Sequence, residues 1–335
     1  MASAPRTIAV LGPGSWGTAL AIQLCRNDQH VRLWGNDPDQ IEALCRDREN
    51  KRFLPGVPLP EPLLPVVDLD EALAGIVAVL VVVPSHAFAE VAAELATRLP
   101  DDLGIAWATK GFAPDGDRLL HQVAAERLGE RPMAVVSGPS FAAEVARGLP
   151  TAVTVAANTP AFAQHIAALL HSERFRAYTH DDLVGVEVGG AAKNVLAIAT
   201  GIADGLGFGA NTRAALITRG LAELIRLGVA LGGRRETFMG LAGLGDLVLT
   251  CTDDQSRNRR MGLALAKGRG IDEVKREIGQ EVEGILTARS VHAAAQRLGI
   301  EMPISEQVYR VLYQGVTPQQ ATDALLERDL RAELD

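Results

Sequence analysis

The chain has 335 residues, of which 47% are hydrophobic and 22% are charged. This is enough chain for two globular domains, and the composition excludes a disordered or collagen-like protein. Lys and Arg number 33 and Asp and Glu number 41, so the formal net charge is −8 at pH 7. An acidic protein repels polyanions over most of its surface, so we expect no nucleic-acid partner.

The first half alternates short β-branched runs with longer helical patterns, which is typical of βαβ units around a parallel sheet. A helix over residues 17–27 is expected to turn Leu20, Ile22 and Leu24 toward that sheet. The proline-rich segment 55–65 is expected to form a surface loop. The predicted strands are 7–11, 30–34, 76–83, 104–108, 134–137 and 152–156.

Residues 12–17 read Gly-Pro-Gly-Ser-Trp-Gly, which fits the G-x-G-x-x-G motif between a strand and a helix. Gly12 would allow the tight turn, Gly14 would let the backbone approach a pyrophosphate, and Gly17 would permit close helix–sheet packing. The motif therefore predicts a dinucleotide site. The alternative is a glycine turn in an α/β domain that binds no dinucleotide.

The end of the second predicted strand leaves the choice of nicotinamide cofactor open. An acid that closes this strand favours NAD, whereas an arginine favours NADP, and Asn36 is neither. Asp37 could supply the acid. It could equally well cap a helix that begins at Pro38, because Asp is a favoured N-cap before Pro at the first helical position.

From about residue 185 onward, Ala, Leu, Glu and Arg dominate segments with helical spacing. Glycines such as Gly201 and Gly228 are read as stop signals after these helices. We therefore predict an N-terminal α/β, Rossmann-type doubly wound domain over residues 1–188. A mostly α-helical C-terminal domain is predicted over residues 189–335. The expected helices are 191–201, 211–228, 257–267, 271–278, 286–298 and 304–313.

Several polar clusters follow predicted strands or lie in predicted glycine turns, where open α/β sheets bind ligands. In the cluster 189–194, Lys193 enters an otherwise apolar helix, where desolvation would lower its pKa into the range useful for proton transfer. The alternative is a lysine whose ammonium reaches solvent. The other clusters are 83–86, 108–112 and 137–141.

Two further segments could serve a small substrate. Residues 240–246 read as a second glycine-rich turn that ends in the carboxylate of Asp246. Residues 256–260, Ser-Arg-Asn-Arg-Arg, gather hydrogen-bond donors at a predicted helix start, which suits a phosphate dianion. The alternatives are a plain helix connection and a solvated basic face.

The spacing of the cysteines and histidines argues against a metal site. Cys25, Cys45 and Cys251 lie far apart, so neither a disulfide framework nor a thiolate zinc site is expected. The longest apolar run, 72–83, is shorter than the roughly 18 residues that a membrane-spanning helix needs. The first residues lack the pattern of a signal peptide. We therefore expect a cytoplasmic protein without membrane insertion.

Together these segments resemble the bacterial-type NAD(P)-dependent glycerol-3-phosphate dehydrogenase family. The resemblance spans nearly the whole chain, with the motifs in the family's order. The motifs that carry it are 12–17, 82–86, 107–111, 137–140, 193–194, 243–246 and 256–260, with 205–211 and 282–284 in addition.

The resemblance implies reversible hydride transfer between NADH or NADPH and dihydroxyacetone phosphate, which gives sn-glycerol 3-phosphate for phospholipid synthesis. It also implies a homodimer. Lys193 would exchange the proton, with Lys110 and Asp246 beside it. The positions implied for the substrate are Lys110, Gly138, Ser140, Lys193, Asp246, Ser256, Arg257 and Asn258. Those implied for the cofactor are Gly12, Gly14, Ser15, Trp16, Gly17, Asn36, Lys110, Ala142, Arg257, Val282 and Glu283.

Two rival functions stay open on the residues alone. One is a dehydrogenase of the β-hydroxyacid type, which also combines a Rossmann half, a helical half and a Lys-Asn pair. The other is a nucleotide-sensing protein that keeps the fold without catalysis, since a fold does not by itself determine a function. The joint presence of Lys193, Asp246 and Arg257 argues against a sensor, which would need only the glycine turn.

Overall fold

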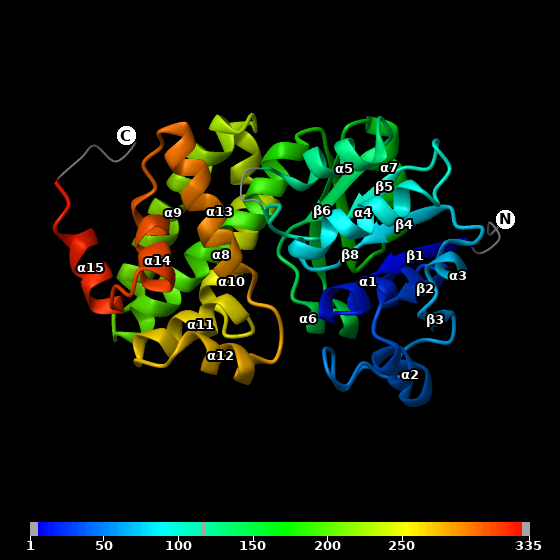
Figure 1. The fold of residues 1–335 in the computed structure, drawn as a ribbon, viewed down its shortest axis with the longest axis horizontal. Helices are drawn as coiled ribbons and strands as arrows, with labels where there is room; N and C mark the ends of the chain where they lie inside the picture. Colours follow the sequence, from blue (N-terminus) through cyan, green and yellow to red (C-terminus); the bar gives the residue numbers. More distant parts are fainter. Residues whose placement is uncertain (1–5, 115–117, 330–335) are drawn as a thin grey trace. The chain divides into compact units, whose positions relative to one another are not determined.

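The computed structural model describes residues 6–114 and 118–329 (Figure 1). The chain divides into two compact units. Unit 1 comprises Met1–Thr109 and Leu120–Leu183, and unit 2 comprises Lys110–Leu119 and Val184–Asp335. Segment 110–119 thus belongs to unit 2, although unit 1 resumes after it in the chain. The division into domains 1–188 and 189–335 stays a prediction.

Unit 1 is built on an eight-stranded sheet with the order β3-β2-β1-β4-β5-β6-β7-β8. All neighbouring strands are parallel except β6 and β7. This arrangement confirms the predicted α/β, Rossmann-type fold. The strands are β1 (Thr7–Leu11), β2 (His30–Trp34), β3 (Leu63–Val66), β4 (Ala78–Val81), β5 (Ile105–Trp107), β6 (Met133–Ser137), β7 (Thr151–Ala157) and β8 (Phe175–His180).

The two edge strands were not predicted. β3 overlaps the end of the proline-rich segment that we expected to be a loop, and Pro65 pairs with Leu33 of β2. A proline has no N–H for the ladder, but an edge strand tolerates it because one side has no partner. β8 escaped prediction because it alternates a buried Phe175 with exposed residues such as Tyr178, so it lacks a continuous apolar run.

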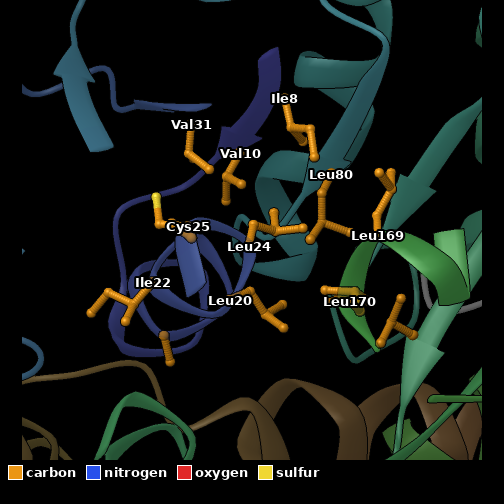
Figure 2. Close-up of a cluster of buried hydrophobic side chains, with 14 of the residues drawn as sticks. Ile8, Val10, Leu20, Ile22, Leu24, Cys25, Val31, Leu80, Leu169 and Leu170 are labelled. Atoms are coloured by element: carbon orange, nitrogen blue, oxygen red, sulfur yellow. The ribbon is translucent and has the colours of Figure 1, made fainter. Parts of the chain in front are cut away.

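The helices of unit 1 pack against this sheet. Figure 2 shows Leu20 and Leu24 of α1 among Ile8, Val10 and Leu80 of the strands, which lie in one buried cluster. Ile22 is 3% exposed and belongs to the same buried cluster. The helices are α1 (Ser15–Arg26), α2 (Pro38–Asp47), α3 (Leu69–Leu73), α4 (Phe88–Ala96), α5 (Leu120–Leu128), α6 (Ala142–Arg147) and α7 (Pro160–Leu170).

Unit 2 is helical in its described part, which confirms that expectation for the C-terminal region. Its centre is α8, which is buried from Gly185 to Ala203. The helices are α8 (Leu183–Gly205), α9 (Ala210–Ala230), α10 (Asp246–Thr252), α11 (Arg257–Ala266), α12 (Ile271–Ile278), α13 (Glu283–Leu298), α14 (Pro303–Tyr313) and α15 (Pro318–Leu326).

By length and composition, helix α8 could cross a membrane. The apolar run 72–83 of the sequence analysis is too short to do so. However, 89% of the most apolar window of α8 is buried inside the fold. It also carries Glu187 and Lys193, both buried. Burial of this kind is typical of the central helix of a globular domain.

Two glycines that were predicted to end helices lie inside them instead. Gly201 belongs to α8, and a Cβ atom there would overlap the carbonyl oxygen of Arg259. Gly228 belongs to α9, where a Cβ atom would overlap the ring of Phe238. The prediction was wrong because these glycines allow helices to approach closely, and neither marks a left-handed cap.

A buried carboxylate ties α9 to α14. Glu223 is 1% exposed and accepts hydrogen bonds from the backbone N–H groups of Ile304 at 2.6 Å and Ser305 at 3.0 Å. The Ser305 hydroxyl donates a third bond at 2.8 Å. Burial raises the pKa of Glu223. The carboxylate therefore satisfies the first N–H groups of α14, which have no partner within the helix.

Replacing Glu223 with alanine is expected to lower the free energy of unfolding by about 3 kcal/mol, because it leaves buried donors without an acceptor. The urea-unfolding midpoint, followed by circular dichroism, would measure this loss. Glu327→Ala, at an exposed position, is the control and should leave the midpoint unchanged. A Glu223→Ala protein as stable as the control would contradict the capping role.

Candidate active site

The glycine-rich turn of unit 1 joins β1 to α1, with Gly14 as the N-cap of the helix. Gly12 has φ +114°, and a Cβ atom there would lie 2.7 Å from the carbonyl oxygen of Val82. A Cβ atom at Gly17 would overlap the carbonyl oxygen of Gly12. A side chain is thus excluded at both positions, in agreement with the tight turn predicted at Gly12 and the close packing predicted at Gly17.

The same turn fits a pyrophosphate. A Cβ atom at Gly14 would meet nothing within 4 Å, so the backbone is open to a ligand on that side. The first turn of α1 contains no acidic residue that would oppose an anion. In the described part of the chain, the indole Nε1 of Trp16 is buried without a hydrogen-bond partner. An open helix N-terminus with an unused donor nearby suits a dinucleotide.

Asp37 caps α2, as one of the two interpretations proposed. Its carboxylate accepts from the backbone N–H of Asp39 at 3.1 Å and of Gln40 at 3.3 Å, and Pro38 takes the first helical position. Asn36 is exposed beyond the end of β2. Asp37 thus has a structural role, and the choice between NADH and NADPH stays open.

Unit 2 brings together three residues that are far apart in the sequence. The ammonium of Lys193, on α8, pairs with Oδ1 of Asp246, the first residue of α10. The ammonium of Lys110 lies 2.7 Å from Oδ2 of the same carboxylate. Asp246 is 1% exposed, so one buried carboxylate holds two ammonium groups.

The environment of Lys193 suits proton transfer. Its side chain is buried, which contradicts the alternative of a lysine that reaches solvent. Burial is the main reason why its pKa falls from 10.5 to about 7. Asp246 opposes this shift, and the positive charge of Lys110 adds to it. Lys193 can therefore gain and lose a proton near neutral pH.

Thr250 completes this group, and the sequence analysis missed it. Its hydroxyl accepts a hydrogen bond from Lys193 Nζ at 2.8 Å and donates one to the carbonyl of Asp246 at 2.6 Å. The available signal was its position one helical turn after Asp246, on the same face of α10. Asp246 and Thr250, both on α10, thus supply two acceptors for the Lys193 ammonium.

The backbone around the group differs from the glycine turns that we predicted. Gly189 lies inside α8, where a Cβ atom would be 2.5 Å from the carbonyl oxygen of Ala242. Residues Leu241–Gly245 form a π-helical turn that leads directly into α10. Gly243 packs there against the backbone of Phe238. These glycines let α8 and the π-helical turn approach closely, which sets Asp246 beside Lys193.

The predicted phosphate-binding segment begins α11. Ser256 is the N-cap and accepts from the backbone N–H of Arg259 at 3.2 Å. Burial lowers the pKa of Arg257, the first residue of the helix, whose guanidinium donates to Gln280 at 3.3 Å. Arg259 is held by ion pairs with two aspartates of unit 2. Arg257 is therefore the better candidate for an anionic ligand.

Asn258 joins three helices. Its Nδ2 donates to Oδ1 of Asn194 at 2.9 Å, and its Oδ1 accepts from the backbone N–H of Gly284 at 2.9 Å. Asn194 follows Lys193 on α8, and Gly284 lies in the first turn of α13. The amide of Asn258 thus links the helix that carries Lys193 to the start of α13.

The other predicted ligand positions lie at loop and helix ends. In unit 1, Gly138 follows β6 with φ +147°, Ser140 Oγ donates to the Gly138 carbonyl at 2.9 Å, and Ala142 begins α6. In unit 2, Val282 is the N-cap of α13 and Glu283 its first residue. Their contacts with ligands stay predictions. Among residues 6–114 and 118–329, no group of three or more His, Cys, Asp or Glu is placed to hold a metal ion.

Comparisons with known proteins agree with this arrangement. The family described as NAD-dependent glycerol-3-phosphate dehydrogenase matches residues 7–163 with its N-terminal part and residues 182–323 with its C-terminal part. A glycerol-3-phosphate dehydrogenase [NAD(P)+] from Thioalkalivibrio sulfidiphilus is 58% identical over 97% of this chain and 98% of its own length. A relative of the same name from Nitrosococcus oceani is 58% identical over 97% of this chain and 94% of its own length.

A solved structure is similar over the same extent. The crystal structure of glycerol-3-phosphate dehydrogenase from Coxiella burnetii superposes with a TM-score of 0.95 at 52% identity. The match covers 97% of this chain and 100% of the other. With these matches and the glycine turn and lysine–aspartate group above, the chain belongs to the NAD(P)-dependent glycerol-3-phosphate dehydrogenase family.

Proposed function

We propose that this protein catalyses reversible hydride transfer between NAD(P)H and the C2 carbonyl of dihydroxyacetone phosphate, which gives sn-glycerol 3-phosphate. The observation that carries the proposal is the buried Lys193, paired with Asp246 and with its pKa lowered to about 7. The names of the similar proteins supply the substrate. In this account the glycine-rich turn of unit 1 holds the pyrophosphate of the cofactor, and Lys193 of unit 2 exchanges the proton with the substrate.

The bound cofactor supplies the hydride, and the protein supplies charge and a proton. Negative charge develops on the C2 oxygen as the carbonyl is reduced, so the Lys193 ammonium stabilises the transition state and then donates its proton to that oxygen. In the reverse direction neutral Lys193 accepts the proton of the C2 hydroxyl. Lys110 adds positive charge to the same place, since it shares the carboxylate of Asp246.

Asp246 and Thr250 keep the Lys193 ammonium in one position. Both accept hydrogen bonds from it, and both belong to α10. An ammonium has three donors, so these two bonds leave a third N–H for the substrate oxygen. Catalysis by this group therefore depends on α10 holding its two acceptors at a constant distance from α8.

The phosphate of the substrate is assigned to the start of α11. Arg257 provides a guanidinium, Ser256 a hydroxyl and Asn258 an amide, and the N-terminus of a helix attracts an anion. Gly138 and Ser140, after β6, are assigned to the substrate as well. The cofactor is assigned to the glycine turn, Ser15, Trp16, Asn36, Lys110, Ala142, Arg257, Val282 and Glu283.

The rates of the two directions should respond to pH in opposite senses. Reduction of dihydroxyacetone phosphate needs protonated Lys193, whose pKa lies at about 7, so its rate should fall as the pH rises through that value. Oxidation of glycerol 3-phosphate needs neutral Lys193, so its rate should rise over the same interval. Initial rates at saturating cofactor between pH 5 and pH 9 would show this, and parallel profiles for both directions would contradict it.

The direct test of the function is the oxidation of NADH and of NADPH by the purified protein with dihydroxyacetone phosphate. We expect oxidation of at least one cofactor and formation of glycerol 3-phosphate. Unphosphorylated dihydroxyacetone is the control and should react poorly. Binding of NAD(P)H without oxidation would favour the sensor, and preference for a carboxylate-bearing substrate would favour the β-hydroxyacid type.

From the family resemblance and the sequence we also propose that the protein is a cytoplasmic homodimer. Its reaction would supply glycerol 3-phosphate for phospholipid synthesis. A phosphorylated small molecule as substrate is consistent with the similar proteins.

A further inference from the structure

We propose that Asn50, assisted by Gln40, is a positioning residue for the glycine-rich turn. By holding the carbonyl of Pro13, it would direct the Gly14 N–H toward the pyrophosphate of the cofactor. The inference rests on the nucleotide site of the proposed function. It concerns two side chains outside the G-x-G-x-x-G motif, and neither was singled out by the sequence.

Both polar atoms of the Asn50 side chain form hydrogen bonds with the surrounding fold. The residue is 2% exposed, and its Nδ2 donates to the Pro13 carbonyl at 2.9 Å and to the Thr18 hydroxyl at 2.8 Å. Its Oδ1 accepts from the backbone N–H of Phe53 at 3.2 Å. One side chain from the segment after α2 thus connects the glycine turn to the first turns of α1.

A second amide reaches the same carbonyl. Gln40 Nε2, from α2, donates to the Pro13 oxygen at 2.8 Å. A carbonyl oxygen has two lone pairs, and here two side-chain amides from different segments occupy them. Pro13 lies between the two glycines that give the turn its freedom of rotation. The proline ring fixes φ of Pro13, so the peptide between Pro13 and Gly14 can turn only through ψ of Pro13 and φ of Gly14. The two hydrogen bonds restrict this remaining rotation.

The geometry of a peptide converts this restraint into a direction for the ligand. The C=O of Pro13 and the N–H of Gly14 belong to one planar trans peptide, so they point in opposite directions. Holding the oxygen toward Asn50 and Gln40 turns the Gly14 N–H to the other side. A Cβ atom at Gly14 would meet nothing within 4 Å, so the backbone there is open to a phosphate. A donor that is already oriented binds an anion without the cost of ordering it.

The test compares Asn50→Ala and Gln40→Ala with a matched control, Asn158→Ala. The Asn158 amide also bonds backbone groups in unit 1, the Arg131 carbonyl at 2.9 Å and the Met133 N–H at 2.8 Å, at the start of β6. Titration calorimetry would give the dissociation constants of ADP and NADPH for each protein. The Michaelis constants for cofactor and substrate would be measured beside them.

We expect Asn50→Ala to weaken ADP and NADPH by about 10-fold, the loss of one oriented hydrogen bond, and Gln40→Ala by about 3-fold. The Michaelis constant of the cofactor should rise by the same factors. The turnover at saturating cofactor and the Michaelis constant of dihydroxyacetone phosphate should stay within about 2-fold. A residue that only stabilised the fold would change none of these constants selectively.

The inference would be overturned if both variants bound ADP as tightly as Asn158→Ala. If Asn50→Ala does not fold, Gln40→Ala decides, because Gln40 lies partly exposed on α2. Failure of the proposed function has a different signature. Weaker ADP binding by the variants of a protein that does not reduce dihydroxyacetone phosphate would support the inference and overturn the reaction. A wild-type protein that binds neither ADP nor NADPH would overturn both.

Discussion

Replacing Lys193 with alanine is expected to lower turnover by about 10² to 10⁴-fold, the usual contribution of a general acid. The variant loses both the proton donor and the ammonium that stabilises charge on the C2 oxygen. Affinity for NAD(P)H should change little, because the pyrophosphate site lies on the glycine turn of unit 1. Steady-state turnover and the dissociation constant of NADPH would measure the two effects.

The matched control for this variant is Lys275→Ala, an exposed lysine on α12. It removes the same charge from unit 2 without touching Asp246. Normal turnover in Lys193→Ala would remove this lysine from the mechanism. A loss of turnover that the control shares would point to the overall charge of the protein.

Replacing Arg257 with alanine is expected to raise the Michaelis constant for dihydroxyacetone phosphate by about 10 to 100-fold, since hydrogen bonds to charged groups contribute about 1.5–3 kcal/mol. Turnover should fall as well, because phosphate binding far from the carbonyl also orients the carbonyl for reaction. Initial rates over a range of substrate concentrations would separate the two effects.

Two controls make the Arg257 result specific. Arg260→Ala removes an exposed arginine from the same segment and should leave the Michaelis constant near the wild-type value. Unphosphorylated dihydroxyacetone should react at the same low rate with wild type and Arg257→Ala. An unchanged Michaelis constant for the phosphorylated substrate would count against the assignment of the phosphate to α11.

Much of the fold could be predicted because its signals are local. The alternation of β-branched runs with helical patterns indicated the parallel sheet, and residues 12–17 indicated the turn at its centre. The edge strands β3 and β8 escaped because edge strands tolerate a proline, as at Pro65, and exposed residues, as at Tyr178. Such strands are defined by their single neighbour, and a sequence does not show which segment that neighbour is.

The glycines of the turn motif were predicted correctly, whereas three glycines that lie inside helices were taken for turns or helix ends. Gly12 needs its positive φ, which follows from the motif. Gly189, Gly201 and Gly228 lie inside helices, where another element approaches too closely for a side chain. The local sequence is compatible with either role, because the partner comes from a distant segment. Only the folded structure distinguishes the two.

In the candidate site, too, the sequence indicated single residues but not the contacts between distant segments. Lys193 stood out because a lone charge in an apolar helix is costly, and Asp246 because it ends a glycine-rich run. That one carboxylate holds both Lys193 and Lys110 depends on packing among distant segments. Thr250 and Asn50 carried no unusual local pattern, since a threonine in a helix and an asparagine in a loop are common. Their importance lies in the partners that the fold gives them.

The most direct test of the central claim follows the hydride itself. The purified protein would be given dihydroxyacetone phosphate and a reduced nicotinamide cofactor with deuterium at the transferring position. Our account predicts that the glycerol 3-phosphate formed carries one deuterium at C2 for each cofactor oxidised, and that Lys193→Ala forms the same product far more slowly. Oxidation of the cofactor without deuterium at C2, or an equal rate in Lys193→Ala, would contradict it.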